Sequence, residues 1–266
     1  MEKINASVGI LTFNSAATLE RALESVKDFE DIIVCDGGST DGTLEIAQRY
    51  GARVIPQDPQ ATGPHRITDF AAVRNRCLEA ARTGWFFYID SDERAEPELV
   101  HEIADIVKQN PPGVRIYKIT PRIIYRGRRI EYASSYPGYQ TRFFKINPKI
   151  HFRKAVHERI EYPSDTEVSI LKGHWNYYLS GPEEIMEDVE IRDIPILFRR
   201  YQNQPTWKRY RGACKSLISL IVIFLKSFRN LFHPTESMPW SVECAKMRVQ
   251  FRFFRALLFG SEKKYG

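Results

Sequence analysis

Two aspartates, Asp90 and Asp92, directly follow the apolar segment 85–89, and their type and spacing suit metal chemistry. In an extended segment, residues i and i+2 point the same way, so both carboxylates can face one point just past the segment's end. A hard divalent cation held by two carboxylates completes its octahedron with water and ligand phosphates. The pair therefore predicts a cation site that also takes a phosphate-bearing ligand. The alternative is a solvated turn whose acids favour the N-terminus of a helix predicted over 96–109.

The aspartates need a buried strand to hold them, and residues 85–89 supply an unbroken apolar run. Such a run is typical of a parallel strand covered on both faces. Apolar patterns predict further strands over 6–13, 32–35 and 53–55, and capping residues and apolar spacing predict helices over 15–26, 43–50 and 70–81. Strands that alternate with helices at this spacing predict a doubly wound, mostly parallel sheet.

Polar residues follow three of these strands: Thr12 and Asn14, then Asp36, then Asp90, Ser91 and Asp92. Ligands of such sheets bind beyond the carboxyl ends of the strands, so these side chains are expected to converge. Asp36, in a Gly-Gly turn, can accept hydrogen bonds from a nucleobase or ribose, while Arg74 can lie across the base or near phosphate. The alternative is that 36–42 is only a tight turn with helix-capping side chains.

These motifs, in order, resemble glycosyltransferase family 2: VGILTFNSAATLERALESV, DGGSTDGT and AAVRNRCLEAARTGWFFYIDSDE. The resemblance implies a GT-A, Rossmann-like fold with a mostly parallel sheet flanked by helices. It also implies a nucleotide-sugar donor, a UDP-sugar first among the candidates, and Mg²⁺ or Mn²⁺ held by Asp90 and Asp92. The residues that it places around the nucleotide are Thr12, Asn14, Asp36, Arg74, Asp90 and Ser91.

The second half resembles a subgroup of small bacterial enzymes that decorate lipopolysaccharide core or related glycolipids, through YRGRRI, YPGYQTRFF, VHER and His174-Trp175. The Glu-Asp dipeptide that supplies the catalytic base in many family members is missing at its usual place. Val156-His157-Glu158 takes that place. The processive Gln-x-x-Arg-Trp pattern is also absent, so transfer of a single sugar is expected.

Glu158 is the candidate base, because a positioned carboxylate can take the proton of an attacking hydroxyl at neutral pH and so give inversion. His157 either orients Glu158 or is itself the base; the alternative is a strand pair with Arg159. His174 is expected to complete the metal site, although a lone histidine also serves as an ordinary hydrogen-bonding group. The arginines of 122–129 suit acceptor phosphates or carboxylates, and a solvated edge hairpin explains them equally.

Charge is uneven along the chain, because residues 201–266 hold 12 Lys and Arg against 3 Asp and Glu. Helices are predicted over 183–201, 207–232 and 239–259. Basic residues beside large apolar ones favour an interfacial helix on an anionic membrane over a nucleic-acid surface. The alternative is that these helices pack on each other or on a partner subunit. The apolar run 216–225 falls short of the roughly 20 residues that a span needs.

The sequence thus predicts a catalytic domain over 1–180 and a helical, basic extension over 181–266. The expected function is an inverting glycosyltransferase that moves one sugar onto a glycolipid or polysaccharide acceptor. We expect a cytoplasmic protein, peripheral at the inner face of the cytoplasmic membrane, because no signal-like segment opens the chain and its cysteines match no zinc spacing. One alternative is a sugar-phosphate nucleotidyltransferase, but that class has a Gly-rich phosphate loop after the first strand, and residues 11–18 contain no glycine. The other alternative is an inactive membrane-associated module that binds nucleotide-sugar.

Overall fold

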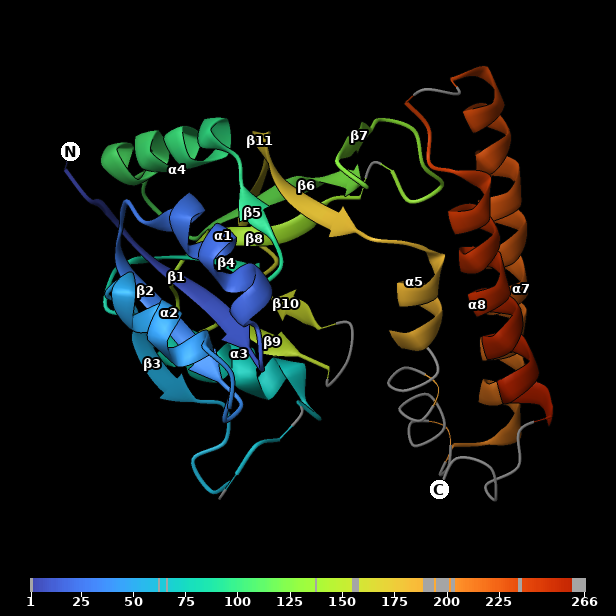
Figure 1. Cartoon of the computed structure of the whole chain (residues 1–266), viewed down its shortest axis with the longest axis horizontal. Helices are drawn as coiled ribbons and strands as arrows, with labels where there is room; N and C mark the ends of the chain where they lie inside the picture. Colours follow the sequence, from blue (N-terminus) through green and yellow to red (C-terminus); the bar gives the residue numbers. More distant parts are fainter. Residues whose placement is uncertain are drawn as a thin grey trace. The chain divides into compact units, whose positions relative to one another are not determined.

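The computed structural model describes residues 2–61, 63–65, 67–136, 138–154, 158–188, 194, 201, 204–233 and 236–259 (Figure 1). The chain divides into two compact units. The first unit comprises Met1–Arg122 and Gly138–Tyr177, and the second comprises Ile123–Pro137 and Tyr178–Gly266. Each unit is described by itself below.

The first unit opens with alternating strands and helices, as the apolar spacing predicts. In chain order these are β1 (Ile4–Thr12), α1 (Ala16–Val26), β2 (Phe29–Asp36), α2 (Thr43–Arg49), β3 (Arg53–Pro56), α3 (Phe70–Glu79) and β4 (Trp85–Asp90). The strands lie in the order β3-β2-β1-β4 and all pair in parallel. The predicted α/β class is therefore confirmed. Asp69 caps α3, its side chain accepting from the backbone N–H of Ala72.

Beyond β4 the sheet becomes antiparallel, so it is mixed rather than mostly parallel. It continues through β8 (Gln140–Lys145), β6 (Arg115–Tyr125), β11 (Glu167–Leu179) and β5 (Arg94–Ala95). The β4–β8, β6–β8 and β11–β5 pairs are all antiparallel. Antiparallel neighbours need no helical crossover, and the only helix in this stretch of the first unit's described residues is α4 (Pro97–Gln109), which precedes β6. A separate two-stranded sheet pairs β9 (His151–Arg153) with β10 (Arg159–Glu161).

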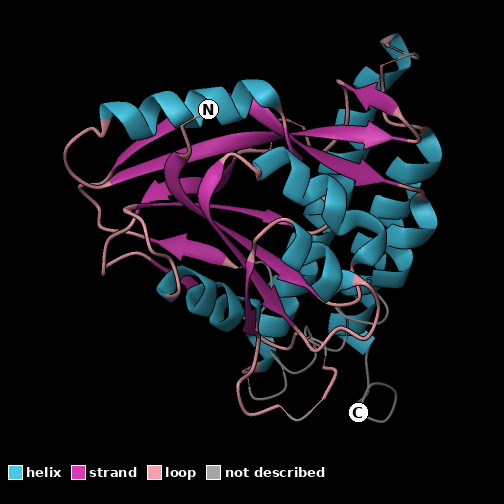
Figure 2. Cartoon of the chain, turned by 60° about the vertical axis from the view of Figure 1, so that its left-hand side comes forward, coloured by secondary structure: helices cyan, strands magenta, loops and turns pink. Residues whose placement is uncertain are grey.

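Strand β4 is apolar throughout because both of its faces are covered. Helices α1 and α4 pack on one face, where Trp85, Phe87 and Ile89 point. Helix α3 packs on the opposite face, where Phe86 and Tyr88 point. Figure 2 shows helices on both sides of the strands of this sheet. The carboxyl end of β4, where the paired aspartates begin, is thus fixed by two apolar layers.

Strand β11 approaches α4 too closely for any side chain at Gly173. A Cβ at that position would lie 2.4 Å from the Cα of Leu99, a backbone atom that cannot move aside. This contact fixes the position of the next residue, His174, whose carbonyl oxygen accepts from the backbone N–H of Glu96 at 3.0 Å.

The second unit begins with a hairpin between the end of β6 and β7 (Arg128–Ile130). Arg126 and Gly127 have φ values of 48° and 77°, which a two-residue type I′ turn requires. The hairpin interpretation of the arginine-rich stretch is therefore confirmed.

Helices make up the rest of the second unit: α5 (Pro182–Asp188), α7 (Thr206–Ser227), the 3₁₀ turn η2 (Phe228–Phe232) and α8 (Trp240–Phe259). The predicted helix over 183–201 lies mostly outside the described residues beyond Asp188. None of the helices in the described part of the chain is long and apolar enough to cross a membrane.

A buried carboxylate, Glu243 of α8, holds the second unit together. It is 0% exposed and accepts from the backbone N–H of Ser134 at 2.8 Å and from its hydroxyl at 2.5 Å. Asn230 donates to it at 3.4 Å, and the Lys246 ammonium lies at the same distance. A buried charge is tolerated only with such partners, so this cluster fixes the segment after β7 on α8.

The first unit also contains a buried carboxylate, Asp31 of β2, whose hydrogen bonds lead to a prediction about pH. It accepts from Ser7 Oγ at 2.7 Å, Arg53 Nε at 2.8 Å and the Arg82 backbone N–H at 3.0 Å. Burial raises the pKa of Asp31, but the hydrogen bonds from Arg53, Ser7 and Arg82 outweigh it and leave the pKa lowered. Ionised Asp31 therefore stabilises the fold above its unfolded pKa of about 4, and this contribution is lost as pH falls through the lower folded pKa.

Asp31→Asn is accordingly expected to reduce the free energy of unfolding by about 2–3 kcal/mol at pH 7, since it leaves Arg53 without its charged partner. The deficit should shrink at pH 3. Urea unfolding at the two pH values measures it, and an equal deficit at both would contradict the assignment.

Candidate active site

The ends of β1 and β2 are joined through the carboxylate of Asp36. Its Oδ1 accepts from Thr12 Oγ1 at 2.8 Å and Ser39 Oγ at 2.6 Å, and its Oδ2 accepts from the backbone N–H groups of Gly38 and Ser39 at 2.8 and 2.7 Å. A carboxylate has about four acceptor positions, so protein donors fill those of Asp36. Asp36 shapes the loop here, and a hydrogen bond from it to a nucleotide requires one of these donors to move.

Asn14 connects the loop after β1 to the loop after β2. It adopts a left-handed conformation with φ of 49°, and its Oδ1 accepts from the backbone N–H of Thr40 at 2.9 Å. Ser15 extends the connection to β4, because the hydroxyl of Ser91 donates to Ser15 Oγ at 3.0 Å. The three polar strand ends that the sequence expects to converge therefore meet.

Arg74 of α3 joins the end of β4 to Glu158. Its Nη2 forms an ion pair with Asp90 Oδ1, and its Nε donates to Glu158 Oε1 at 3.3 Å. Burial lowers the pKa of the Arg74 guanidinium, but the carboxylates of Asp90 and Glu158 raise it above its ordinary value, so it stays charged. Its Nη1 is buried without a hydrogen-bond partner in the described part of the chain. That N–H is a spare donor at the junction of the two carboxylates.

Arg142 of β8 forms a second buried pair, with Glu93, that the sequence reasoning did not identify. The guanidinium donates to both carboxylate oxygens at 2.9 Å. It lies 4.8 Å from the ring centre of Tyr88 and 4.2 Å from that of Trp175. The available signals were the acid that ends DSDE and the arginine of YPGYQTRFF, which has no acidic residue near it in the sequence. The pair lies next to the carboxyl end of β4, where Glu93 contacts the backbone of Asp90.

Glu93 in turn fixes the first aspartate. Its Oε2 accepts from the backbone N–H of Asp90 at 2.8 Å, and Arg142 lies 3.9 Å from Asp90 Oδ2. Burial raises the pKa of Glu93 above its ordinary range, and the neighbouring Arg142 opposes the rise. Glu93 therefore holds the backbone of Asp90, while Arg74 and Arg142 lie at its carboxylate.

The chemistry of the strand end fits a divalent cation with two protein carboxylates. Asp90 and Asp92 have partly exposed side chains at one strand end, and hard cations prefer such oxygens. His174 has another contact: its Nδ1 is 3.1 Å from the carbonyl oxygen of Thr120. Within the described ranges, no three His, Cys, Asp or Glu residues are placed to hold a metal together. Asp90, Asp92 and His174 therefore do not form such a group, and the role of His174 as a third ligand stays a prediction.

The two candidates for the base differ in what the structure says of them. Glu158 precedes β10, with its side chain 19% exposed and Oε1 anchored on Arg74. Its Oε2 accepts no hydrogen bond from the residues that the structure describes. His157 lies outside the described residues.

The chain belongs to glycosyl transferase family 2, because the model of that family matches residues 7–157. The mixed sheet with flanking helices agrees with the GT-A fold that the family implies. Among curated proteins, the glycosyltransferase SunS of the Bacillus subtilis prophage SPbeta is 29% identical over 151 residues, which are 56% of this chain and 33% of SunS. An uncharacterized glycosyltransferase of Rickettsia felis is 36% identical over 128 residues, 47% of this chain and 42% of the relative. The chain thus spans less than half the length of these relatives.

Solved structures that are similar to the chain include the following two. Glucosyl-3-phosphoglycerate synthase from Mycobacterium tuberculosis, crystallised with Mn²⁺, UDP and glucosyl-3-phosphoglycerate, is 27% identical, with a TM-score of 0.35, and covers 46% of this chain and 44% of its own. S. aureus TarS 1–349 in complex with UDP is 15% identical, with a TM-score of 0.48, and the match covers 98% of this chain and 92% of the TarS chain.

Proposed function

We propose that this protein is a metal-dependent, inverting glycosyltransferase that moves one sugar from a nucleotide-sugar to a glycolipid or polysaccharide acceptor of lipopolysaccharide type. A UDP-sugar is the first candidate for the donor. One observation carries the proposal. A single buried guanidinium, Arg74, contacts both Asp90 of the paired aspartates and Glu158, the candidate base. The donor-side and acceptor-side carboxylates are thereby fixed relative to each other, and positioning of this kind supplies much of the rate of group transfer.

On the donor side, Asp92 is the direct ligand that we propose for Mg²⁺ or Mn²⁺. Asp90 is already paired with Arg74, so it binds the ion through water or contacts ribose. When bound, the ion neutralises charge that develops on the leaving diphosphate. The unpartnered Nη1 of Arg74 can donate to a phosphate oxygen at the same place.

On the acceptor side, Glu158 is the group that we propose to take the proton from the attacking hydroxyl. Arg74 holds Oε1, which leaves Oε2 to receive the proton. His157 is proposed to orient Glu158. The attack comes from the face opposite the diphosphate, so the configuration at the anomeric carbon inverts.

The second unit supports a lipid-borne acceptor and a place at the inner face of the cytoplasmic membrane. Helix α7 exposes large apolar side chains to solvent, among them Ile218 at 59%, Leu225 at 61% and Trp207 at 57%. An apolar, basic helix face of this kind is typical of interfacial membrane helices.

Thermal-shift measurements with UDP, GDP, ADP, CMP and TDP, each with and without Mn²⁺, test the donor. A ligand at 100 times its Kd stabilises the folded state by about 2.7 kcal/mol. We expect one diphosphate to raise the Tm, and more strongly with Mn²⁺. No shift with any nucleotide would contradict the nucleotide-sugar site that we propose. A shift with one nucleotide that Mn²⁺ does not strengthen would remove the metal from the proposal.

A further inference from the structure

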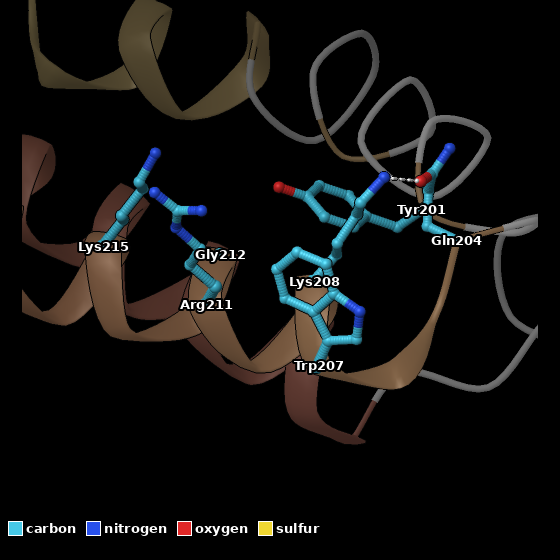
Figure 3. Close-up of a pocket in the computed structure, with 7 residues that line it drawn as sticks. All are labelled: Tyr201, Gln204, Trp207, Lys208, Arg211, Gly212 and Lys215. Carbon is cyan, nitrogen blue, oxygen red and sulfur yellow. Dashed lines mark hydrogen bonds between the residues drawn. The ribbon is translucent and has the colours of Figure 1, made fainter.

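A cavity of about 410 Å³ lies against the first turns of α7, within the second unit. Three cationic residues, Lys208, Arg211 and Lys215, line it, together with Tyr201, Gln204, Trp207 and Gly212. Figure 3 shows the three cationic side chains on the same side of α7, the side on which Tyr201 lies. The cavity is distant in sequence from the aspartates and Glu158, and the proposed sugar transfer does not use it.

Among the residues that the structure describes, those that line this cavity include three cations and no carboxylate. Lys208 donates to Gln204 Oε1 at 2.7 Å, while Arg211 and Lys215 have no ion-pair partner in the part of the chain that the structure describes. Helix α7 itself contains no Asp or Glu. Two cations without a described ion-pair partner in one cavity suit an anion, and the Arg211 fork suits the oxygens of a phosphate group.

Gly212, one of the lining residues, has no room for a side chain. A Cβ there would lie 2.9 Å from Tyr201 Oη and 3.0 Å from Leu257 Cδ1, so any larger residue would displace one of them. The glycine thus allows the Tyr201 hydroxyl to approach α7 beside the cations.

The basic residues continue into an apolar stripe along α7. Lys208, Arg211 and Lys215 are followed at spacings of three and four by Ile218, Val222 and Leu225, so all six share one helix face. The burial of α7 is inverted, because its buried residues are the small Gly212, Ala213 and Ser227, while Ile218, Val222 and Leu225 are 59%, 43% and 61% exposed. In water such a face is unfavourable unless something apolar covers it.

We propose that the cavity binds the phosphate headgroup of an anionic membrane phospholipid, with the apolar stripe of α7 in contact with the hydrocarbon beside it. The inference deepens the membrane-facing part of the proposed function and rests on it. Charge complementarity favours this occupant over a second copy of the chain, whose matching face would be equally basic. The apolar stripe favours it over nucleic acid, which binds basic faces without such a surplus of large apolar groups.

Vesicle flotation of the full chain tests the proposal, with vesicles of phosphatidylcholine alone or mixed with phosphatidylglycerol. We expect binding to the mixed vesicles, and we expect the double variant Arg211→Gln, Lys215→Gln to bind them at least tenfold more weakly than a matched control. The control, Lys226→Gln with Arg248→Gln, removes the same charge from exposed positions outside the cavity. Equal losses in both variants would show diffuse attraction only and would overturn the site.

Thermal shifts distinguish the lipid headgroup from free phosphate. Short-chain, soluble phosphatidylglycerol should raise the Tm of the wild type and not that of the cavity variant, and inorganic phosphate at the same concentration should raise it less. An equal effect of inorganic phosphate would overturn the lipid assignment. Neither assay contains a sugar donor, so a failure here leaves the transferase proposal standing, and loss of sugar transfer alone leaves the lipid site standing.

Discussion

Asp92→Asn is expected to lower sugar transfer by about 10³-fold or more while the protein stays folded. Asparagine keeps the shape of aspartate but loses the negative charge that holds a divalent ion, and loss of charge stabilisation at a leaving group costs roughly this much. The side chain is only partly buried, so we expect the folded state to tolerate the change. The measurement is kcat/KM with the nucleotide-sugar that the thermal-shift experiment selects, at saturating Mn²⁺.

A second readout separates metal binding from misfolding. The variant should keep its Tm without ligands and lose the extra stabilisation that Mn²⁺ gives to the nucleotide complex. Asp105→Asn, on the exposed side of α4, is the control and should keep both properties. Full activity in Asp92→Asn would remove the metal role from the paired aspartates.

The parallel half of the sheet was predictable because its signals are local. An apolar strand without alternation needs two covered faces, and β4 has α1 and α4 on one face and α3 on the other. The polar strand ends were predictable for the same reason, since parallel strands present their carboxyl ends at one edge. The sequence therefore located Thr12, Asn14 and Asp36 beside one another.

The antiparallel half was harder to predict because its pairing joins segments far apart in the chain. Strand β8 inserts between β4 and β6, and no local pattern in residues 140–145 specifies that place. The Glu93–Arg142 pair follows from this insertion, so it is invisible until the topology is known. Burial of both charges is then explained by mutual pairing, with Tyr88 and Trp175 against the guanidinium.

The residue types of Asp36 and Arg74 did not predict which groups these two side chains contact. Asp36 was predicted to contact the nucleotide, yet four protein donors occupy its oxygens, a count that depends on the exact turn. Arg74 was predicted near the base or phosphate, and in the structure it joins Asp90 to Glu158. Neither arrangement follows from spacing, because the first depends on the geometry of the turn at Gly38 and Ser39 and the second on the position of the distant Glu158.

Glu158→Gln is expected to lower kcat by about 10²–10⁴-fold, the usual contribution of a general base, with donor binding unchanged. Glutamine keeps an oxygen that can accept from Arg74 Nε, so the position of the side chain is preserved, but the amide cannot take a proton. Single-turnover transfer rates measure the effect, and nucleotide-dependent thermal shifts measure donor binding.

The matched control for that variant is Glu161→Gln in β10, an exposed glutamate of the same short hairpin whose partner is Arg153. It should transfer sugar at the wild-type rate. Glu158 contacts Arg74, whereas Glu161 pairs with Arg153. A loss confined to Glu158→Gln would therefore assign the proton transfer to the carboxylate that Arg74 holds. Undiminished transfer in Glu158→Gln would instead move the role of base to His157, and a pH profile of His157→Asn would then be expected to lose its acidic limb.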